Sequence, residues 1–270
     1  MKIVSLMLML MLCSCGATKV PFQPHLTHDV KSIEVAKIEV DRLLLIKRVN
    51  PLFLVMGSSG MVMDALVVAR HASKYEERAG AVHQMSVNLF KKTLMQSLAQ
   101  LGFQAHSSDK RFWDYFKPSQ KYLRQTTDAI LHIRLNQLGF WSSGIKEGYF
   151  PSLVVTAKLI DPVSREVLYS DRFAIGVDFT SVEMMGVTGG KAHILPLQGH
   201  FSPYKDFKTL LDNPEKSRDD LFKVIAFAVS QIMQGLEKPK LPSLLVFDPS
   251  LIKVMPSLPL STQMQEKLLP

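Results

Sequence analysis

The clearest pattern in the chain is an alternation of apolar and polar positions in its middle third. Leu131, Ile133 and Leu135 alternate with histidine, arginine and asparagine, which is typical of a strand with one buried and one polar face. A second alternating run and a third apolar run flank a turn sequence at residues 161–166. We therefore predict that residues 153–175 form a long antiparallel hairpin, and that the three successive strands form a meander.

Two segments have the periodicity of amphipathic helices. In residues 79–101, apolar side chains recur at spacings of three and four, and Gly102 ends the segment. The apolar positions of this helix are Val87, Phe90, Leu94, Leu98 and Leu101. A capping-box pattern at residues 217–220 predicts the start of a closing helix that extends to Gly235. The apolar stripe of the closing helix is Leu221, Val224, Ile225, Ala228 and Ile232.

Two further strands are expected outside the meander. Residues 40–49 are rich in branched and apolar side chains and end at Asn50-Pro51, which indicates a buried strand closed by a turn. Residues 103–106 form a short strand after the first helix. The sequence therefore predicts a mixed α/β (α+β) fold, in which an antiparallel or mixed sheet of about four to five strands carries two main helices.

Residues 52–69 are strongly apolar and are interrupted by the glycines and serines of 57–60. We interpret 57–60 as a loop that leads into a helix packed closely through Ala65 and Ala69. A glycine-rich turn can cradle phosphate, but this one lacks the Lys-Ser/Thr of a Walker loop and the third glycine of a dinucleotide fingerprint. The alternative is a segment that touches a membrane or a partner subunit.

Aromatic and basic residues are interleaved in residues 109–122. The aromatic residues are Phe112, Trp113, Tyr115, Phe116 and Tyr122, and the basic ones are Lys110, Arg111, Lys117 and Lys121. Such a mixture could stack bases or grip a sugar polymer. We favour the simpler interpretation that the rings anchor a loop on the core.

The first fifteen residues have the pattern of an export signal. Lys2 is followed by an apolar run from residue 3 to residue 12, which is too short to span a bilayer. Leu12, Ser14 and Cys15 then resemble a bacterial lipobox. That resemblance implies cleavage before Cys15, a diacylglyceryl thioether on its sulfur and a third acyl chain on its nitrogen. Two or three chains on one residue make a stable membrane anchor.

The lipobox resemblance sets the expected domain organisation. We predict a lipoprotein signal peptide at 1–14, a tether at 15–36, a periplasmic α/β domain at 37–236 and a proline-rich tail at 237–270. We predict that residues 177–202 form a long loop within the domain. In enteric-type sorting, a residue other than Asp after the lipid-bearing cysteine resembles an outer-membrane address, and Gly16 occupies that place.

Composition and charge fit a folded protein at an envelope surface. The chain has 270 residues, 47% hydrophobic and 21% charged, and removal of residues 1–14 leaves 256, enough for a full core. The net charge of +8 falls to +7 when Lys2 is lost. The basic residues are scattered rather than clustered, so we expect no nucleic-acid partner. Both cysteines lie in the signal region, which leaves no disulfide for the mature protein.

Residues that could carry chemistry are sparse. The closely spaced histidine pair is His25-x-x-His28, with no cysteine left to complete a metal site. No Gly-x-Ser-x-Gly elbow is present, and His132 falls on the polar face of a strand. We therefore expect no metal, no cofactor and no catalytic residue, and interpret the protein as non-enzymatic.

Three short sequence segments resemble the core strands of periplasmic domains in several bacterial lipoprotein groups. They are Asp128-Ala129-Ile130-Leu131, Leu159-Ile160-Asp161 and Val167-Leu168-Tyr169. The similar groups are the curli-secretion lipoprotein, the TolB amino-terminal domain and the lipoprotein activators of penicillin-binding proteins. This resemblance covers about half the chain and carries over no functional residue; it implies binding to other envelope proteins.

Three classes of function remain open on the sequence. The leading hypothesis is a lipid-anchored interaction or accessory component of an envelope-spanning machine for secretion, motility or wall synthesis, located at the periplasmic face of the outer membrane. Its expected partners are the membrane, through the anchor, and other envelope proteins, with a homo-oligomer as a further option. The alternatives are an oligomeric outer-membrane export pore and an enzyme acting on wall polymer or lipid.

Overall fold

The computed structural model describes residues 19–22, 30–40, 44–117, 127–144, 146–177, 192–195 and 201–237. All described residues belong to the first of two units of the chain, residues 1–237. The expected signal peptide, all but one residue of the expected tail and most of the expected 177–202 loop lie outside the described residues.

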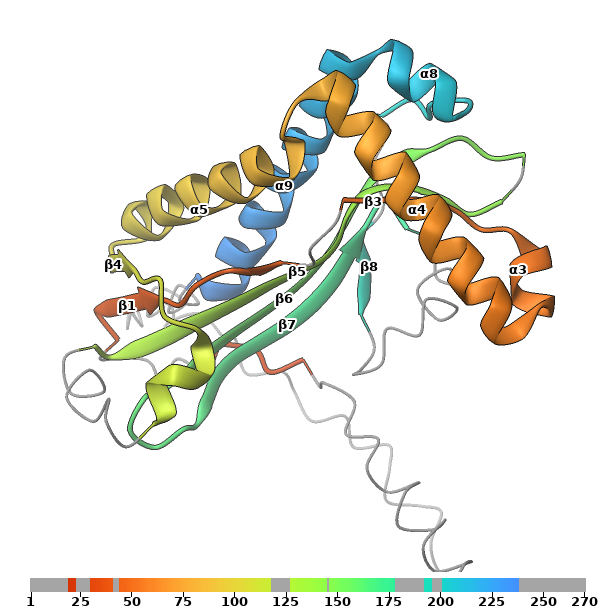
Figure 1. The fold of residues 1–270 in the computed structure, drawn as a ribbon. Coiled ribbons are helices and arrows are strands. Elements are labelled where there is room, and N and C mark those ends of the chain that lie inside the picture. Colours follow the sequence, from red (N-terminus) through yellow and green to blue (C-terminus); the bar gives the residue numbers. More distant parts are fainter. Residues whose placement is uncertain are drawn as a thin grey trace, which may run out of the picture. The chain divides into compact units, whose positions relative to one another are not determined.

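Among the described residues of the first unit, one mixed sheet has eight strands, with the order β4-β1-β5-β6-β7-β8 along its main path (Figure 1). Its strands are β1 (Ser32–Val35), β2 (Glu39–Val40), β3 (Leu45–Arg48), β4 (Gln104–Ser107), β5 (Ala129–Ser142), β6 (Phe150–Ile160), β7 (Val167–Ile175) and β8 (His193–Leu195). β5, β6 and β7 pair antiparallel, and every other pairing is parallel. The predicted mixed α/β class is confirmed. The strand number exceeds the prediction because β1, β2 and β3 are short and pair in succession with one long strand, β5.

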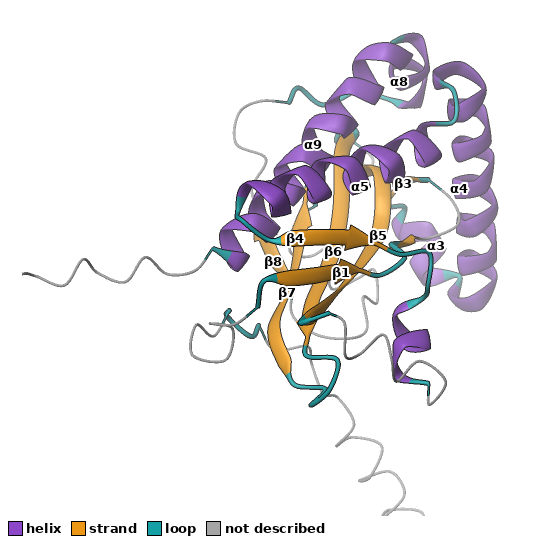
Figure 2. Ribbon diagram, turned by 90° about the vertical axis from the view of Figure 1, so that its left-hand side faces the viewer, coloured by secondary structure: helices purple, strands orange, loops and turns teal. Residues whose placement is uncertain are grey.

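The helices gather on one face of this sheet and at its edge. They are α3 (Pro51–Val55), α4 (Gly57–Ala79), α5 (Val82–Gln100), α8 (Phe207–Asp212) and α9 (Pro214–Leu236), with a 3-10 turn η1 (Phe112–Phe116). α5 and α9 lie side by side, and α9 packs on β6 and β7 (Figure 2). α4 packs on β3. The main core lies between the helices and the sheet, and holds Phe90 and Leu94 of α5 together with Val224 and Ile225 of α9.

The two clearest sequence patterns predict the correct elements. The hairpin expected at 153–175 is confirmed as β6 and β7, which pair antiparallel. The helix expected at 79–101 is confirmed as α5, with Phe90, Leu94 and Leu98 fully buried. Gly102 follows it with φ +88°, the left-handed conformation that ends many helices.

The loop predicted at residues 57–60 is wrong, because these residues form the first turn of α4. Gly60 is buried against the carbonyl of Phe53, where a Cβ would overlap the oxygen, so the glycine serves helix packing. The predicted packing through Ala65 is also wrong, because Ala65 is exposed, whereas Ala69 is half-buried. The buried face of α4 lies further along, at Ala72, Tyr75 and Ala79.

The capping box predicted at residues 217–220 is wrong as well. α9 begins at Pro214, whose missing N–H and fixed φ suit the first position of a helix. Ser217 is fully buried one turn later, where its hydroxyl donates to the Pro214 carbonyl at 3.0 Å. Gly235 lies inside the helix, which ends at Leu236, and a Cβ at Gly235 would come within 2.6 Å of the Tyr169 hydroxyl.

The aromatic residues after β4 anchor their segment on the sheet, which confirms the interpretation favoured from the sequence. Phe112 and Tyr115 are buried in a small cluster with Ile130 and Ile160, on the face away from α5 and α9. Tyr115 donates a hydrogen bond to Glu34 of β1 at 2.8 Å. Trp113 stays 69% exposed. Residues 118–126, which include Lys121 and Tyr122, lie outside the described residues.

Part of the stretch predicted to be a tether belongs to the sheet. β1 lies within residues 15–36, and Val20 exchanges backbone hydrogen bonds with Ser170 of β7 at 2.8 and 2.9 Å. β8 likewise falls within the predicted 177–202 loop. Among the described helices, none is long and apolar enough to cross a bilayer.

Candidate functional site

An apolar surface on α3 and the first half of α4 is the most prominent exposed feature of the described residues. Its members are Leu52, Val55, Met56, Met61, Val62, Met63 and Leu66, and they are between 48% and 86% exposed. These are seven of the eleven large hydrophobic residues that are exposed in the described part of the chain. We call this group the α3–α4 apolar surface.

The local sequence explains why this surface projects. Asn50 accepts a hydrogen bond from the Leu52 amide at 3.1 Å, and Ser59 donates to the Met56 carbonyl at 2.8 Å. Gly60 then allows α4 to approach α3 closely. Within residues 57–66 only Gly60 is buried, so the apolar side chains of this part of α4 find no place in the core.

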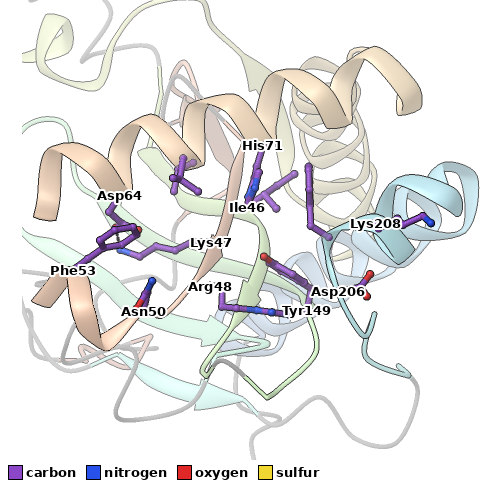
Figure 3. Close-up of a pocket in the computed structure, with 13 residues that line it drawn as sticks. Ile46, Lys47, Arg48, Asn50, Phe53, Asp64, His71, Tyr149, Asp206 and Lys208 are labelled. Carbon is purple, nitrogen blue, oxygen red and sulfur yellow. Dashed lines mark ion pairs between the residues drawn. The ribbon is translucent and has the colours of Figure 1, made fainter.

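A pocket of about 520 Å³ opens between α4, β3 and the start of α8 (Figure 3). This volume is within the range of about 300–1,000 Å³ typical of small-molecule sites. Apolar walls come from Phe53, Val67, Val68, Tyr149 and Phe207, and polar groups from Lys47, Arg48, Asn50, Asp64, His71, Asp206 and Lys208. The pocket shares α3 and α4 with the α3–α4 apolar surface.

An ion pair fixes one wall of the pocket. Lys47 of β3 extends to Asp64 of α4, with 2.5 Å between Nζ and the carboxylate oxygen. The same ammonium group lies 5.7 Å from the centre of the Trp141 ring, within the range of a cation–π contact. Asp64 is the first charged residue of α4, so this pair attaches the apolar first half of the helix to the sheet.

Arg48 follows Lys47 on β3 and runs in the other direction, beside Tyr149 (Figure 3). Its guanidinium lies 4.9 Å from the centre of the Tyr149 ring. One terminal nitrogen donates to the carbonyls of Glu147 and Lys205, at 3.3 and 3.2 Å. Arg48 therefore joins β3 to the segments before β6 and α8.

His71 and Asp206 occupy the far end of the pocket. The His71 ring stacks on Phe207, with 3.9 Å between centroids and 22° between planes. Burial lowers the pKa of His71, against a hydrogen bond to the Ile46 backbone that raises it; Lys74, Arg70 and Arg48 lower it further. Asp206 accepts hydrogen bonds from the amide and hydroxyl of Thr209, which lower its pKa.

The charged groups that line the pocket are mostly paired within the described residues. Each carboxylate that lines it is already engaged, Asp64 by Lys47 and Asp206 by Thr209. His71 is stacked and held near its neutral form. Within the described residues, no group of three or more His, Cys, Asp or Glu could hold a metal ion.

The residues singled out in the sequence are not brought together by this site. Cys15, His25 and His28 lie outside the described residues. His132 is half-buried on β5, stacks on Phe112 with 4.3 Å between centroids, and lies 3.4 Å from Glu39. The pocket residues come from segments too distant in sequence for any spacing to reveal them. The α3–α4 apolar surface, in contrast, falls in the 52–69 run that the sequence indicated.

No family model matches the chain, and no curated protein matches it in sequence. Among solved structures it is similar to a dodecamer of a PelC variant from Paraburkholderia phytofirmans, with TM-score 0.35 and 12% identity over 82% of this chain and 96% of that one. A lipoprotein from Neisseria meningitidis has TM-score 0.28 and 15% identity, over 57% and 92%. The LpoB C-terminal domain from Salmonella enterica has TM-score 0.19 and 11% identity, over 58% and 96%. TM-scores this low do not establish a shared fold.

Proposed function

We propose that this protein is a non-catalytic, lipid-anchored component of a bacterial cell envelope that binds another envelope protein through its α3–α4 apolar surface. The anchor is Cys15, in the outer membrane and facing the periplasm, on the strength of the lipobox at Leu12, Ser14 and Cys15. The partner belongs to an envelope-spanning machine for secretion, motility or wall synthesis. The observation that carries the proposal is the exposure of the α3–α4 apolar surface.

The energetics favour a partner at this surface. Burial of one Val, Leu or Met side chain contributes about 1.5–3 kcal/mol, so several such side chains supply a large part of the free energy of a stable complex. Contiguous apolar patches on folded proteins mark interaction sites more often than isolated apolar residues do. Met56, Met61 and Met63 add flexible, polarisable side chains that adapt to a partner.

The alternatives find less support among the described residues. The pore hypothesis depended on the hairpin at 153–175, whose side chains are mostly buried within this chain. The enzyme hypothesis needs a free acid or base in a cleft, and both carboxylates of the pocket are engaged. A direct membrane contact of α3 and α4 is the closest competitor, because residues 51–63 carry no charge.

A matched pair of valine substitutions tests the proposal. Val62 on α4 is 61% exposed, and Val163 in the β6–β7 turn is 71% exposed. The native protein and the variants Val62→Asp and Val163→Asp are purified from the membrane in mild detergent, and their partners are quantified by mass spectrometry. We expect Val62→Asp to lower the yield of a stoichiometric envelope protein by about tenfold or more, and Val163→Asp to leave it unchanged.

The other outcomes separate the competing functions. A large ring of this chain alone, disrupted by Val62→Asp, would replace the foreign partner with a second copy. Retention of a Cys15→Ser protein on membranes, lost on adding Val62→Asp, would assign the surface to lipid. A partner retained equally by both valine variants would overturn the role of the α3–α4 apolar surface. A Cys15→Ser protein that is still lipidated and sedimented would overturn the anchor.

A further inference from the structure

Three basic residues gather on the face of the sheet away from α5 and α9. The strand register places Thr156 of β6 between Arg134 of β5 and Arg172 of β7. Because side chains alternate along a strand, these three share a face. The core residues Ile133, Ala157 and Phe173 point to the opposite, helix-covered face. Lys158, two residues after Thr156, lies on the same face and is paired in register with His132.

The positive charge of this group is poorly compensated. Within the described residues, no carboxylate forms an ion pair with Arg134, Lys158 or Arg172. Glu39 of β2 is in register with Arg134, but its carboxylate lies 3.4 Å from His132. Glu34 of β1 also shares this face, but it accepts a hydrogen bond from Tyr115, so among the described residues neither carboxylate forms an ion pair with the three basic side chains.

Arg172 carries a buried hydrogen-bond donor and a positive charge that lack a partner among the described residues. Its side chain is half-buried, and its Nε is inaccessible to solvent and has no hydrogen-bond partner among the residues that the structure describes. Burial lowers its pKa, and the charge of Arg134 lowers it further, which places the two guanidinium groups within electrostatic range. A buried donor without an acceptor destabilises the folded state, and like charges on adjacent strands add repulsion. An anion that contacts both guanidinium groups offsets this repulsion.

We infer that Arg134, Lys158 and Arg172, with the Thr156 hydroxyl, bind a phosphate group. Adjacent strands lie about 4.8 Å apart, so the arginine backbones are separated by about 10 Å and their long side chains can meet over Thr156. Donors then approach one centre from three strands. A phosphate offers oxygens in all these directions, whereas a carboxylate offers two in one plane. The charge of a phosphate monoester, about −1.5 to −2, also matches the excess positive charge.

The site is independent of the α3–α4 apolar surface and of any protein partner. Its test is the binding of inorganic phosphate to the full-length protein in detergent, measured by calorimetry. We expect Arg172→Gln to weaken phosphate binding by about tenfold or more, because a charge-assisted hydrogen bond is lost. Arg134→Gln, at an exposed side chain that burial does not constrain, should weaken it comparably. Arg78→Gln, at an exposed arginine of α4, is the matched control and should bind as the native protein does.

Two phosphate sources are distinguished by a second titration, with vesicles containing phosphatidic acid and the Cys15→Ser protein. Binding of inorganic phosphate supports a site for soluble phosphate compounds. Vesicle binding that depends on Arg134 and Arg172, without binding of inorganic phosphate, supports a lipid headgroup. The inference is overturned if neither probe binds, or if the two arginine variants bind phosphate as tightly as Arg78→Gln.

Discussion

The hydroxyl of Tyr75 lies 2.8 Å from the hydroxyl of Ser217, in a buried hydrogen bond that joins α4 to α9 across 142 residues of sequence. Ser217 donates its own proton to the Pro214 carbonyl, so Tyr75 is the donor in this bond. Burial raises the pKa of Tyr75 to about 12, so the phenol keeps its proton at neutral pH. The bond therefore fixes the helix that carries the α3–α4 apolar surface to the helix at the centre of the core.

Removal of this hydroxyl should destabilise the protein modestly. We expect Tyr75→Phe to lower the free energy of unfolding by about 1 kcal/mol, the usual contribution of a neutral hydrogen bond. The ring keeps its edge-on contact with Phe140, at 5.4 Å between centroids. Urea denaturation of the native and variant proteins measures the change. A loss of several kcal/mol would show that the bond does more than join two helices.

A second buried hydroxyl should matter more, because its acceptor is charged. Tyr204 donates to the Asp220 carboxylate at 2.8 Å, and Asp220 is only 4% exposed. We expect Tyr204→Phe to lower the free energy of unfolding by about 1.5–3 kcal/mol, the contribution of a hydrogen bond to a charged group. Lys223, at 3.0 Å from Asp220, keeps the carboxylate paired in the variant. An effect smaller than that of Tyr75→Phe would contradict this ranking.

The sequence predicted those elements whose own residues decide their structure. The hairpin of β6 and β7 and the helix α5 follow from alternation and from helical spacing, which depend only on near neighbours in the chain. The first turn of α4, at residues 57–60, does not follow from such a pattern, because a glycine-rich segment at the start of a helix has the sequence of a typical loop. The close approach of Gly60 to Phe53 depends on how α3 packs on α4, which no local pattern encodes.

The same distinction separates the α3–α4 apolar surface from the basic group and the pocket. The apolar run at 52–69 is visible in the sequence, although the expected burial of Ala65 and Ala69 hid how exposed it is. The basic group needs the register of three strands, which sets Arg134 and Arg172 on either side of Thr156. The pocket joins β3, α4 and the start of α8, so it exists only after the sheet and helices have packed.

Gly139 on β5 should tolerate no side chain. It follows an irregularity in the β5–β6 pairing, has φ +154° and lies against β3, where a Cβ would overlap the carbonyl oxygen of Leu45. We expect Gly139→Ala to lower the free energy of unfolding by about 3 kcal/mol, from strain and from separation of β3 and β5. Gly144→Ala is the control, since a Cβ there would meet its nearest neighbour, Glu147, at 3.9 Å. Equal urea midpoints for the two variants would show that β3 can move away from Gly139 without loss of stability.

Stability should fall as the pH drops below the ordinary pKa of histidine. Burial is the main cause that lowers the pKa of both His71 and His132 from 6.5; Glu39 opposes it at His132, and Lys158 and Arg134 reinforce it. A histidine with a lowered pKa in the folded state binds fewer protons there than in the unfolded state, so its contribution to stability is complete above pH 6.5 and is lost as the pH falls toward the folded pKa.

The measurement is the urea midpoint between about pH 5 and pH 8, the range in which histidine changes charge. We expect the native protein to lose stability toward the acid end, and the double variant His71→Gln, His132→Gln to show a flatter profile. His106→Gln, at an exposed position on β4, is the control and should keep the native slope. The Asp206 carboxyl, whose pKa is lowered from 3.8 by its hydrogen bonds to Thr209, contributes only at more acid pH. A urea midpoint of the native protein that rises toward pH 5 would contradict the predicted loss of stability, and with it the burial of the two histidine rings.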